Sequence, residues 1–382
     1  MRGRPGRAAS VAAFVAFACA PGRPPGPLTP ASTPGPFVAG YHPWWALSPV
    51  AWSDYPFDLL DRLYVFAIEV GGDGGIQDPH GWPEAWDPLV HRARAAGVDV
   101  ALTLTLHDPP TADPEAPAGS GAFETLFSDP TRSALLIDRV VERVVSSPEV
   151  GGLHLDLEVF RSVPPEARDG YTAFVVALDR RLAEAAPGVA LSIFALATDP
   201  WDAYDERTLA AAVDYLVVQG YDLHHRRDSR AGPVAPTRGW GNLNLESVVA
   251  RYRSLGVPPG KMVLGLPLYG YEWPVVDDAP GAATRGEGIT VPLADPAGVL
   301  PEAPTARERV AEFGVRRDPE TGVPWYAFRT DAGFVQGWFD DAESLAAKYR
   351  WARARGLAGV ALFPLAYGDA EIWEGLRRSY RR

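Results

Sequence analysis

Short apolar segments alternate with amphipathic segments along most of the chain from residue 37 onward. Eight of the apolar segments have the length and composition of buried β-strands. They lie at residues 37–41, 62–70, 98–106, 151–160, 189–196, 215–221, 262–269 and 359–365. Helical spacing of apolar residues fills nearly all the intervals between them. Apolar strands that alternate with helices indicate a parallel sheet covered on both faces, and eight such units predict an α/β fold, the closed (β/α)8 TIM barrel.

One interval interrupts this alternation. Residues 273–338 are rich in Gly, Pro and aromatic residues and lack a strong helical pattern. We expect a small, mostly β insertion of the α+β class there, between strand 7 and strand 8 of the barrel. The barrel itself is then expected at residues 37–272 and 339–382. An open, doubly wound sheet is the alternative fold, but no glycine-rich phosphate-binding loop follows the first strand.

The first 36 residues follow a different pattern. Residues 1–19 contain a basic start, an apolar run too short to span a bilayer and then Cys19, which predicts an export signal peptide. Ala18 and Cys19 resemble a bacterial lipoprotein cleavage site, so a lipid anchor at Cys19 and a plain secretory signal both stay open, with a disordered tail as the remaining alternative. Residues 20–36 are rich in Pro and Gly, which predicts a linker. We therefore expect an exported protein, either a cell-envelope lipoprotein or a secreted one.

Charge and cysteine content narrow the classes of partner. The chain has 36 Lys and Arg against 48 Asp and Glu, a formal net charge of −12. So acidic a chain is unsuited to nucleic acid or to an anionic membrane surface, and it suits a neutral substrate. Its single Cys excludes an intrachain disulfide framework. We expect a monomer with no cofactor and no metal ion.

The most informative stretch is residues 151–160, Gly-Gly-Leu-His-Leu-Asp-Leu-Glu-Val-Phe. His154, Asp156 and Glu158 alternate with apolar residues, so the three polar side chains share one face of a strand. Buried carboxylates are costly unless they are paired or used chemically. Two carboxyl groups about 7 Å apart along a strand can couple, which raises the pKa of one of them and keeps it protonated near neutral pH. A proton donor beside a carboxylate is what cleavage of a glycosidic bond requires.

In a TIM barrel the chemistry lies where the strands end, at the carboxyl-terminal face. Glu158 is the last of its row and is expected nearest the barrel mouth, with Asp156 one step below it and His154 deeper. The other polar or aromatic side chains at expected strand ends are Tyr41, His42, Glu69, His107, Asp108, Thr198, Asp199, Gln219, Tyr221, Asp222, Tyr269, Tyr271 and Glu272.

Residues 151–158 resemble the fourth-strand signature of the family 18 glycoside hydrolases, the chitinase-like family, which is usually Asp-Gly-x-Asp-x-Asp-x-Glu. Residues 219–222, Gln-Gly-Tyr-Asp, are similar to the family's Met-x-Tyr-Asp, and residues 264–270, Leu-Gly-Leu-Pro-Leu-Tyr-Gly, to its seventh strand. The resemblance covers most of residues 37–375. It implies a chitinase-like glycosidase on a TIM barrel with a small insertion domain.

The resemblance also implies a substrate-assisted, retaining mechanism, in which the sugar's own acetamido oxygen attacks the anomeric carbon. By resemblance, Glu158 is the general acid and base, Asp156 orients the acetamide, and Tyr221 bonds the acetamide oxygen. The residues expected to contact substrate around them are Tyr41, His154, Gln219, Asp222, Tyr269 and Phe363. The expected substrate is a β-linked N-acetylamino-sugar glycan, either chitin-like or peptidoglycan-like.

Three positions depart from the family pattern. Gly151 and His154 replace the first and middle aspartates, and Phe363 stands where a tryptophan usually floors the sugar site. A histidine can donate to Asp156 as an imidazolium or as the right neutral tautomer, and we expect it to lower the pKa of Asp156. Phenylalanine offers less stacking area than tryptophan.

Other classes of function remain open. A sugar-binding barrel without turnover fits the Gly151 and His154 replacements. A metal-dependent hydrolase would draw its ligands from His42, His107, His154 and Asp156, although no dense histidine cluster occurs. A variant of the glycosidase mechanism uses Glu272, after the seventh strand, as a covalent nucleophile.

Overall fold

The computed structural model describes residues 37–106 and 121–379. The expected signal peptide, the linker, Cys19, His107 and Asp108 lie outside these residues. Within them, no helix has both the length and the apolar character needed to cross a membrane.

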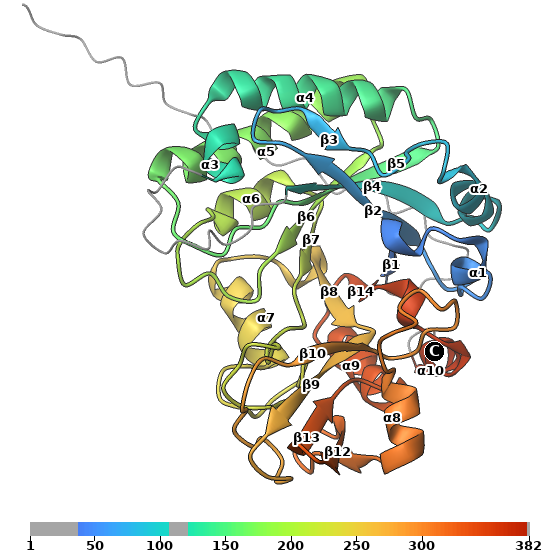
Figure 1. Ribbon diagram of the computed structural model, residues 1–382. Helices are drawn as coiled ribbons and strands as arrows, with labels where there is room; N and C mark the ends of the chain where they lie inside the picture. The colour runs from blue at the N-terminus through green and yellow to red at the C-terminus, as the bar shows by residue number, and fades with distance from the viewer. Residues whose placement is uncertain (1–36, 107–120, 380–382) are drawn as a thin grey trace, which may run out of the picture.

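Eight parallel strands form a closed barrel (Figure 1). They are β1 (Phe37–Pro43), β2 (Arg62–Val70), β4 (Asp99–Leu106), β5 (Val150–Asp156), β6 (Ala190–Ala195), β7 (Tyr215–Val218), β8 (Met262–Pro267) and β14 (Gly359–Phe363). The barrel closes because β1 pairs in parallel with both β2 and β14. The predicted TIM barrel is therefore confirmed, and the open doubly wound sheet is wrong. A short strand, β3 (Ile76–Asp78), pairs antiparallel with the end of β2.

Helices cover the outside of the barrel (Figure 1). They are α1 (Pro49–Trp52), α2 (Asp87–Ala95), α3 (Ala122–Phe127), α4 (Pro130–Val145), α5 (Pro165–Ala185), α6 (Glu206–Ala212), α7 (Leu245–Ser254), α9 (Ala342–Ala354) and α10 (Ala370–Ser379). In α4 the side chain of Asp129 caps the first turn by accepting from the Thr131 N–H, and Leu136, Val140 and Val144 form its buried stripe. This amphipathic spacing places α4 against α5 and α3.

A second, antiparallel sheet lies between β8 and β14 in the chain. It consists of β9 (Tyr269–Val275), β10 (Ile289–Pro292), β11 (Arg316–Arg317), β12 (Pro324–Thr330) and β13 (Gly333–Trp338), with the helix α8 (Ala306–Phe313) beside it. Figure 1 shows this sheet and α8 at the lower end of the molecule, away from α4 and α5. The sheet begins at Tyr269, so residues 269–272, which the sequence pattern predicts to lie in the barrel, belong to β9.

The barrel interior is filled mainly by small and aromatic side chains. They are Phe37, Ala39, Tyr41, Tyr64, Ala101, Tyr215, Val217, Val263 and Ala361. At the amino-terminal end of β2, the buried Arg62 donates to Asp99 through Nε and through a second guanidinium nitrogen, at 3.0 and 2.7 Å. The Asp99 carboxylate occupies the space that a Cβ at position 151 would need. Gly151 therefore allows this ion pair to form at the base of the barrel.

Candidate active site

A cavity of about 190 Å³ opens at the carboxyl-terminal face of the barrel. It is lined by Tyr41, Phe66, Asp156, Glu158, Phe160, Phe194, Gln219, Tyr221, Asp222, Tyr269 and Phe363. The structure thus brings together every expected site residue except His154. The chain supplies them from the ends of strands β1, β2, β5, β6 and β14 and from the segments that follow β5, β7 and β8. Strand ends of a barrel converge in this way because parallel strands finish at the same face.

Two carboxyl groups share the cavity wall. Glu158 lies two residues beyond the last residue of β5, and its pKa is raised well above the ordinary value by burial, by Asp156 and by Asp222. Burial also raises the pKa of Asp156 to about 7. Among the described residues, Asp156 Oδ1 is buried without a hydrogen-bond partner. Glu158 therefore keeps its proton at neutral pH, and Asp156 is the carboxyl group that ionises first.

His154 lies below the cavity rather than in its wall. Its Nε2 is 2.9 Å from the Tyr41 hydroxyl, and its Nδ1 is 3.0 Å from the Ser192 hydroxyl. Because Ser192 Oγ donates to the Leu153 carbonyl at 3.4 Å, these contacts fit a neutral ring with its proton on Nδ1. Burial and the nearby Arg62 lower the His154 pKa to about 3.

This arrangement corrects two expectations about His154. The residue is fully buried, so it does not belong among the groups that contact substrate. Both ring nitrogens are used by Tyr41 and Ser192, so His154 does not bond Asp156. The pKa of Asp156 is accordingly raised and not lowered. The histidine instead holds the Tyr41 hydroxyl in place beneath the cavity.

Phe363 is the centre of an aromatic floor. Its ring stacks on Tyr221 with 6.2 Å between centroids and 18° between planes. Tyr41, Phe66 and Tyr269 meet it edge-on, with centroids 5.7, 5.3 and 6.4 Å away. Edge contacts of this kind fix the orientation of an aromatic ring. The floor therefore presents a rigid apolar surface to whatever enters the cavity.

Tyr221 and Asp222, which follow β7, form a polar part of the cavity wall. Asp222 adopts a left-handed backbone with φ of 57°, which aspartate tolerates better than most residues. Its Oδ1 accepts hydrogen bonds from the hydroxyls of Tyr269 and Tyr271 at 2.7 and 2.8 Å. Burial and the carboxyl groups of Asp156, Glu158 and Asp222 raise the pKa of Tyr221 well above its ordinary value. Tyr221 consequently remains a hydroxyl donor at any physiological pH.

The side chain of Gln219 is held by a hydrogen bond from the backbone of another segment. Its Oε1 accepts from the Ala197 N–H at 3.1 Å, which ties the end of β7 to the segment after β6.

Phe66, Phe160 and Phe194 line the cavity and were missed by the sequence analysis. The alternation of the strands could have identified two of them. Phe66 lies two residues after Tyr64, and Phe194 lies two residues after Ser192. Alternate residues of a strand share a face, so both phenylalanines face the barrel interior with the predicted site.

Among the described residues, the groups that the alternative mechanisms need are not assembled in the cavity. Glu272 accepts from Arg309 at 2.8 and 3.1 Å and from the Tyr326 hydroxyl at 2.9 Å, inside the second sheet. His42 lies on the opposite face of β1 from Tyr41, where its Nδ1 is 2.7 Å from the Tyr55 hydroxyl. Within residues 37–106 and 121–379, no group of three or more His, Cys, Asp or Glu side chains is arranged to hold a metal ion.

Comparisons with known proteins agree with this geometry. Residues 116–368 match the model of the family described as glycosyl hydrolases family 18. Chitotriosidase-1 of Mus musculus is 28% identical over 239 residues, covering 57% of this chain and 49% of that protein. Cortical fragment-lytic enzyme of Bacillus subtilis is 25% identical over 264 residues, covering 65% of this chain and 56% of that protein. The chain therefore spans about half the length of these curated relatives.

A solved structure supports the fold independently. The group IV chitinase of Ostrinia furnacalis, solved in complex with allosamidin, superposes with a TM-score of 0.73 at 19% identity, covering 90% of this chain and 98% of that one. The family model covers well over half of the chain and includes β5, β7, β8 and the cavity residues they position. The chain belongs to the glycosyl hydrolases of family 18.

Proposed function

We propose that the protein is a glycosidase that cleaves β-linked N-acetylamino-sugar glycans by substrate-assisted, retaining hydrolysis. One observation carries the proposal. Glu158 borders an open cavity, and its pKa is raised by burial and by two neighbouring carboxyl groups, Asp156 and Asp222. A carboxylic acid that stays protonated at neutral pH is the proton donor that a glycosidic oxygen needs as it leaves.

The cavity residues can be assigned to steps of that reaction. The apolar face of a sugar ring stacks on Phe363, and Glu158 donates its proton to the leaving glycosidic oxygen. The substrate's acetamido oxygen then forms a bond to the anomeric carbon as the bond to the leaving group breaks. Ionised Asp156 accepts the acetamide N–H and stabilises the positive charge that develops, while the Tyr221 hydroxyl donates to the acetamide oxygen.

Water completes the cycle. Glu158, now a carboxylate, takes a proton from a water molecule that attacks the anomeric carbon from the side of the departed group. The bond to the acetamido oxygen breaks, and the product has the original configuration. Glu158 is left protonated for the next turnover. Glu272 takes no part in these steps, because Arg309 and Tyr326 hold it in the second sheet.

Two kinds of glycan are tested as substrates. The names chitotriosidase and cortical fragment-lytic enzyme point to different substrates, so chitin oligomers and peptidoglycan fragments are both offered. A sugar-binding barrel without turnover is the second candidate, because Gly151 and His154 replace two aspartates of the family motif. If the protein is such a binding barrel, we expect wild type and Glu158→Gln both to bind glycan without releasing products.

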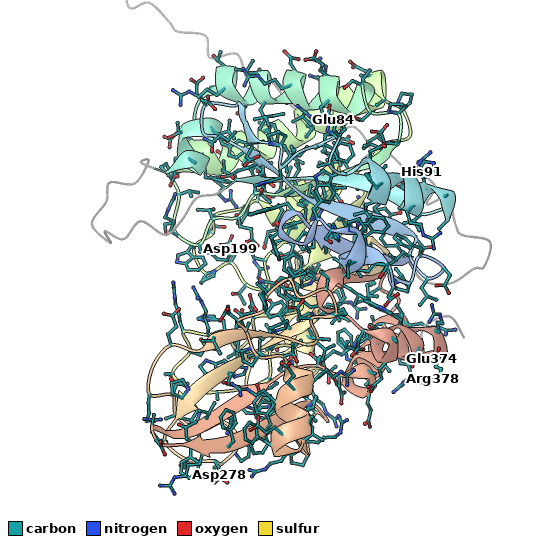
Figure 2. All side chains as sticks on the ribbon, turned by 45° about the vertical axis from the view of Figure 1, so that its right-hand side comes forward. Glu84, His91, Asp199, Asp278, Glu374 and Arg378 are labelled. Carbon is teal, nitrogen blue, oxygen red and sulfur yellow. The ribbon has the colours of Figure 1, made fainter. Side chains whose placement is uncertain are left out.

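The decisive experiment compares wild type with Glu158→Gln, using product identification by mass. We expect wild type to release amino-sugar products and the variant to lose about 10²- to 10⁴-fold in kcat. Glu84→Gln is the matched control, because Glu84, labelled in Figure 2, is an exposed glutamate that does not line the cavity. Binding of both glycans by wild type without any product would reject the glycosidase in favour of the binding barrel.

We also propose that the protein is exported and acts on a glycan outside the cytoplasm. The support is the basic and apolar pattern of residues 1–19 followed by Cys19 and a Pro/Gly-rich segment. A lipid at Cys19 would tether the enzyme to the envelope.

A further inference from the structure

We infer that Tyr204 is a positioning residue that fixes the backbone on both sides of Glu158 and thereby aims its carboxyl group. The inference rests on the proposed function, because Glu158 is the proton donor there. Tyr204 lies between β6 and α6, far from Glu158 in the chain. It lies outside the lining of the 190 Å³ cavity and belongs to no part of the predicted site.

The phenol oxygen of Tyr204 makes one hydrogen bond before Glu158 and one after it. Its hydroxyl donates to the Leu157 carbonyl at 3.1 Å, and its oxygen accepts from the Val159 N–H at 2.7 Å. One oxygen therefore joins the peptide group that precedes Glu158 to the peptide group that follows it. We call this pair of bonds the Tyr204 bracket. It restrains the φ and ψ angles of Glu158 itself.

The Tyr204 bracket restrains a segment that is no longer hydrogen-bonded within the sheet. Strand β5 ends at Asp156, so its pairing with β4 and β6 stops before Glu158. Glu158 also borders a second, smaller cavity of about 20 Å³ on the side of Tyr171 and Tyr204. With open space on both sides, the backbone conformation decides how far the carboxyl group reaches into the larger cavity.

Tyr204 is itself anchored well enough to serve as a support. Its N–H donates to Asp199 Oδ2 at 3.1 Å, and its carbonyl accepts from Arg168 at 3.2 Å. Its ring packs edge-on against Tyr171 and Phe123, with centroids 5.7 and 6.0 Å apart. Catalytic groups keep productive geometry when neighbours lock them in this way, and small displacements of a reacting group are costly in rate.

The test is Tyr204→Phe, which removes only the bracketing oxygen. We expect kcat to fall about 10- to 100-fold while KM changes little, since the variant misplaces the proton donor without altering the sugar floor. Tyr252→Phe is the matched control. The Tyr252 hydroxyl is buried and donates to the Leu196 carbonyl at 2.6 Å. It also lies 3.2 Å from Glu206 Oε1, but no hydrogen bond joins it to residues 157–159.

A second variant and a second measurement keep the result decisive. Asp199→Ala leaves the phenol in place but removes its backbone anchor, and we expect a smaller loss of kcat in the same direction; Asp199 is labelled in Figure 2. This variant carries the test if Tyr204→Phe does not fold. In selectively ¹⁵N-valine-labelled protein, we expect exchange of the Val159 amide proton to be slow in wild type and fast in Tyr204→Phe.

The outcomes separate this inference from the proposed function. An inactive wild type would reject the proposed function, and Val159 exchange would still decide whether the Tyr204 bracket exists. A folded Tyr204→Phe with wild-type kcat, or with the same loss as Tyr252→Phe, would overturn the positioning role. Unchanged Val159 exchange would overturn the bracket itself.

Discussion

Replacing His154 by glutamine tests whether the barrel interior holds a neutral histidine. The ring is fully buried, both nitrogens are bonded, and its pKa is lowered from 6.5 to about 3 by burial and by Arg62. The unfolded chain takes up a proton at this residue near pH 6.5, whereas the folded chain does so only near pH 3. The stabilisation is therefore complete above pH 6.5 and is lost as the pH falls from about 6.5 towards 3.

The magnitude follows from the two pKa values. Between pH 7.5 and pH 5.0, protonation of the unfolded state at one such histidine lowers the free energy of unfolding by about 2 kcal/mol. The limit below pH 3 is about 5 kcal/mol, because each unit of pKa difference contributes about 1.4 kcal/mol. His42 and Asp156 also titrate between folded and unfolded states, so the wild-type pH dependence alone does not isolate His154.

The assay is urea unfolding of wild type and His154→Gln at pH 7.5 and at pH 5.0. We expect wild type to lose about 2 kcal/mol more than the variant on acidification, since the titration of the other groups is shared. The constant cost of the substitution cancels in this double difference. A variant that loses more stability than wild type on acidification would refute the reasoning and support an imidazolium paired with Asp156.

Two further predictions concern the buried ion pair of Lys348 and Asp340 and the export signal. Lys348→Met should destabilise the fold by about 3 to 5 kcal/mol, because it leaves Asp340 charged, buried and without its ammonium partner; adding Asp340→Asn should recover much of the loss, and urea titrations that show no recovery would contradict the pairing. Cys19→Ser should release the protein from the membrane fraction and abolish labelling by a radioactive fatty acid, whereas a wild-type protein found only in the medium would argue for a plain secretory signal.

The barrel was predictable because its signal is local. Each strand is a separate apolar run, and the alternation of His154, Asp156 and Glu158 is visible within a single segment. The facing of those side chains follows from the pleat alone, so the position of Glu158 at the cavity could be predicted without knowing any neighbour.

The partners of these residues could not be predicted, because they come from other strands. Nothing near His154 in the chain points to Tyr41 or Ser192. The same holds for Glu272 and Arg309, which lie 37 residues apart. The end of β8 could not be predicted from the sequence pattern either, because an apolar run continues through Pro267 into β9 at Tyr269.

The ion pair of Arg62 and Asp99 constrains how this barrel can change. Asp99 fills the room where any side chain at position 151 would start. Restoring the family's aspartate there, alone, would force two acidic groups into one site and displace Asp99 from its guanidinium. Positions 99 and 151 are thus coupled, and we expect an aspartate at position 151 to be tolerated better when residue 99 is smaller.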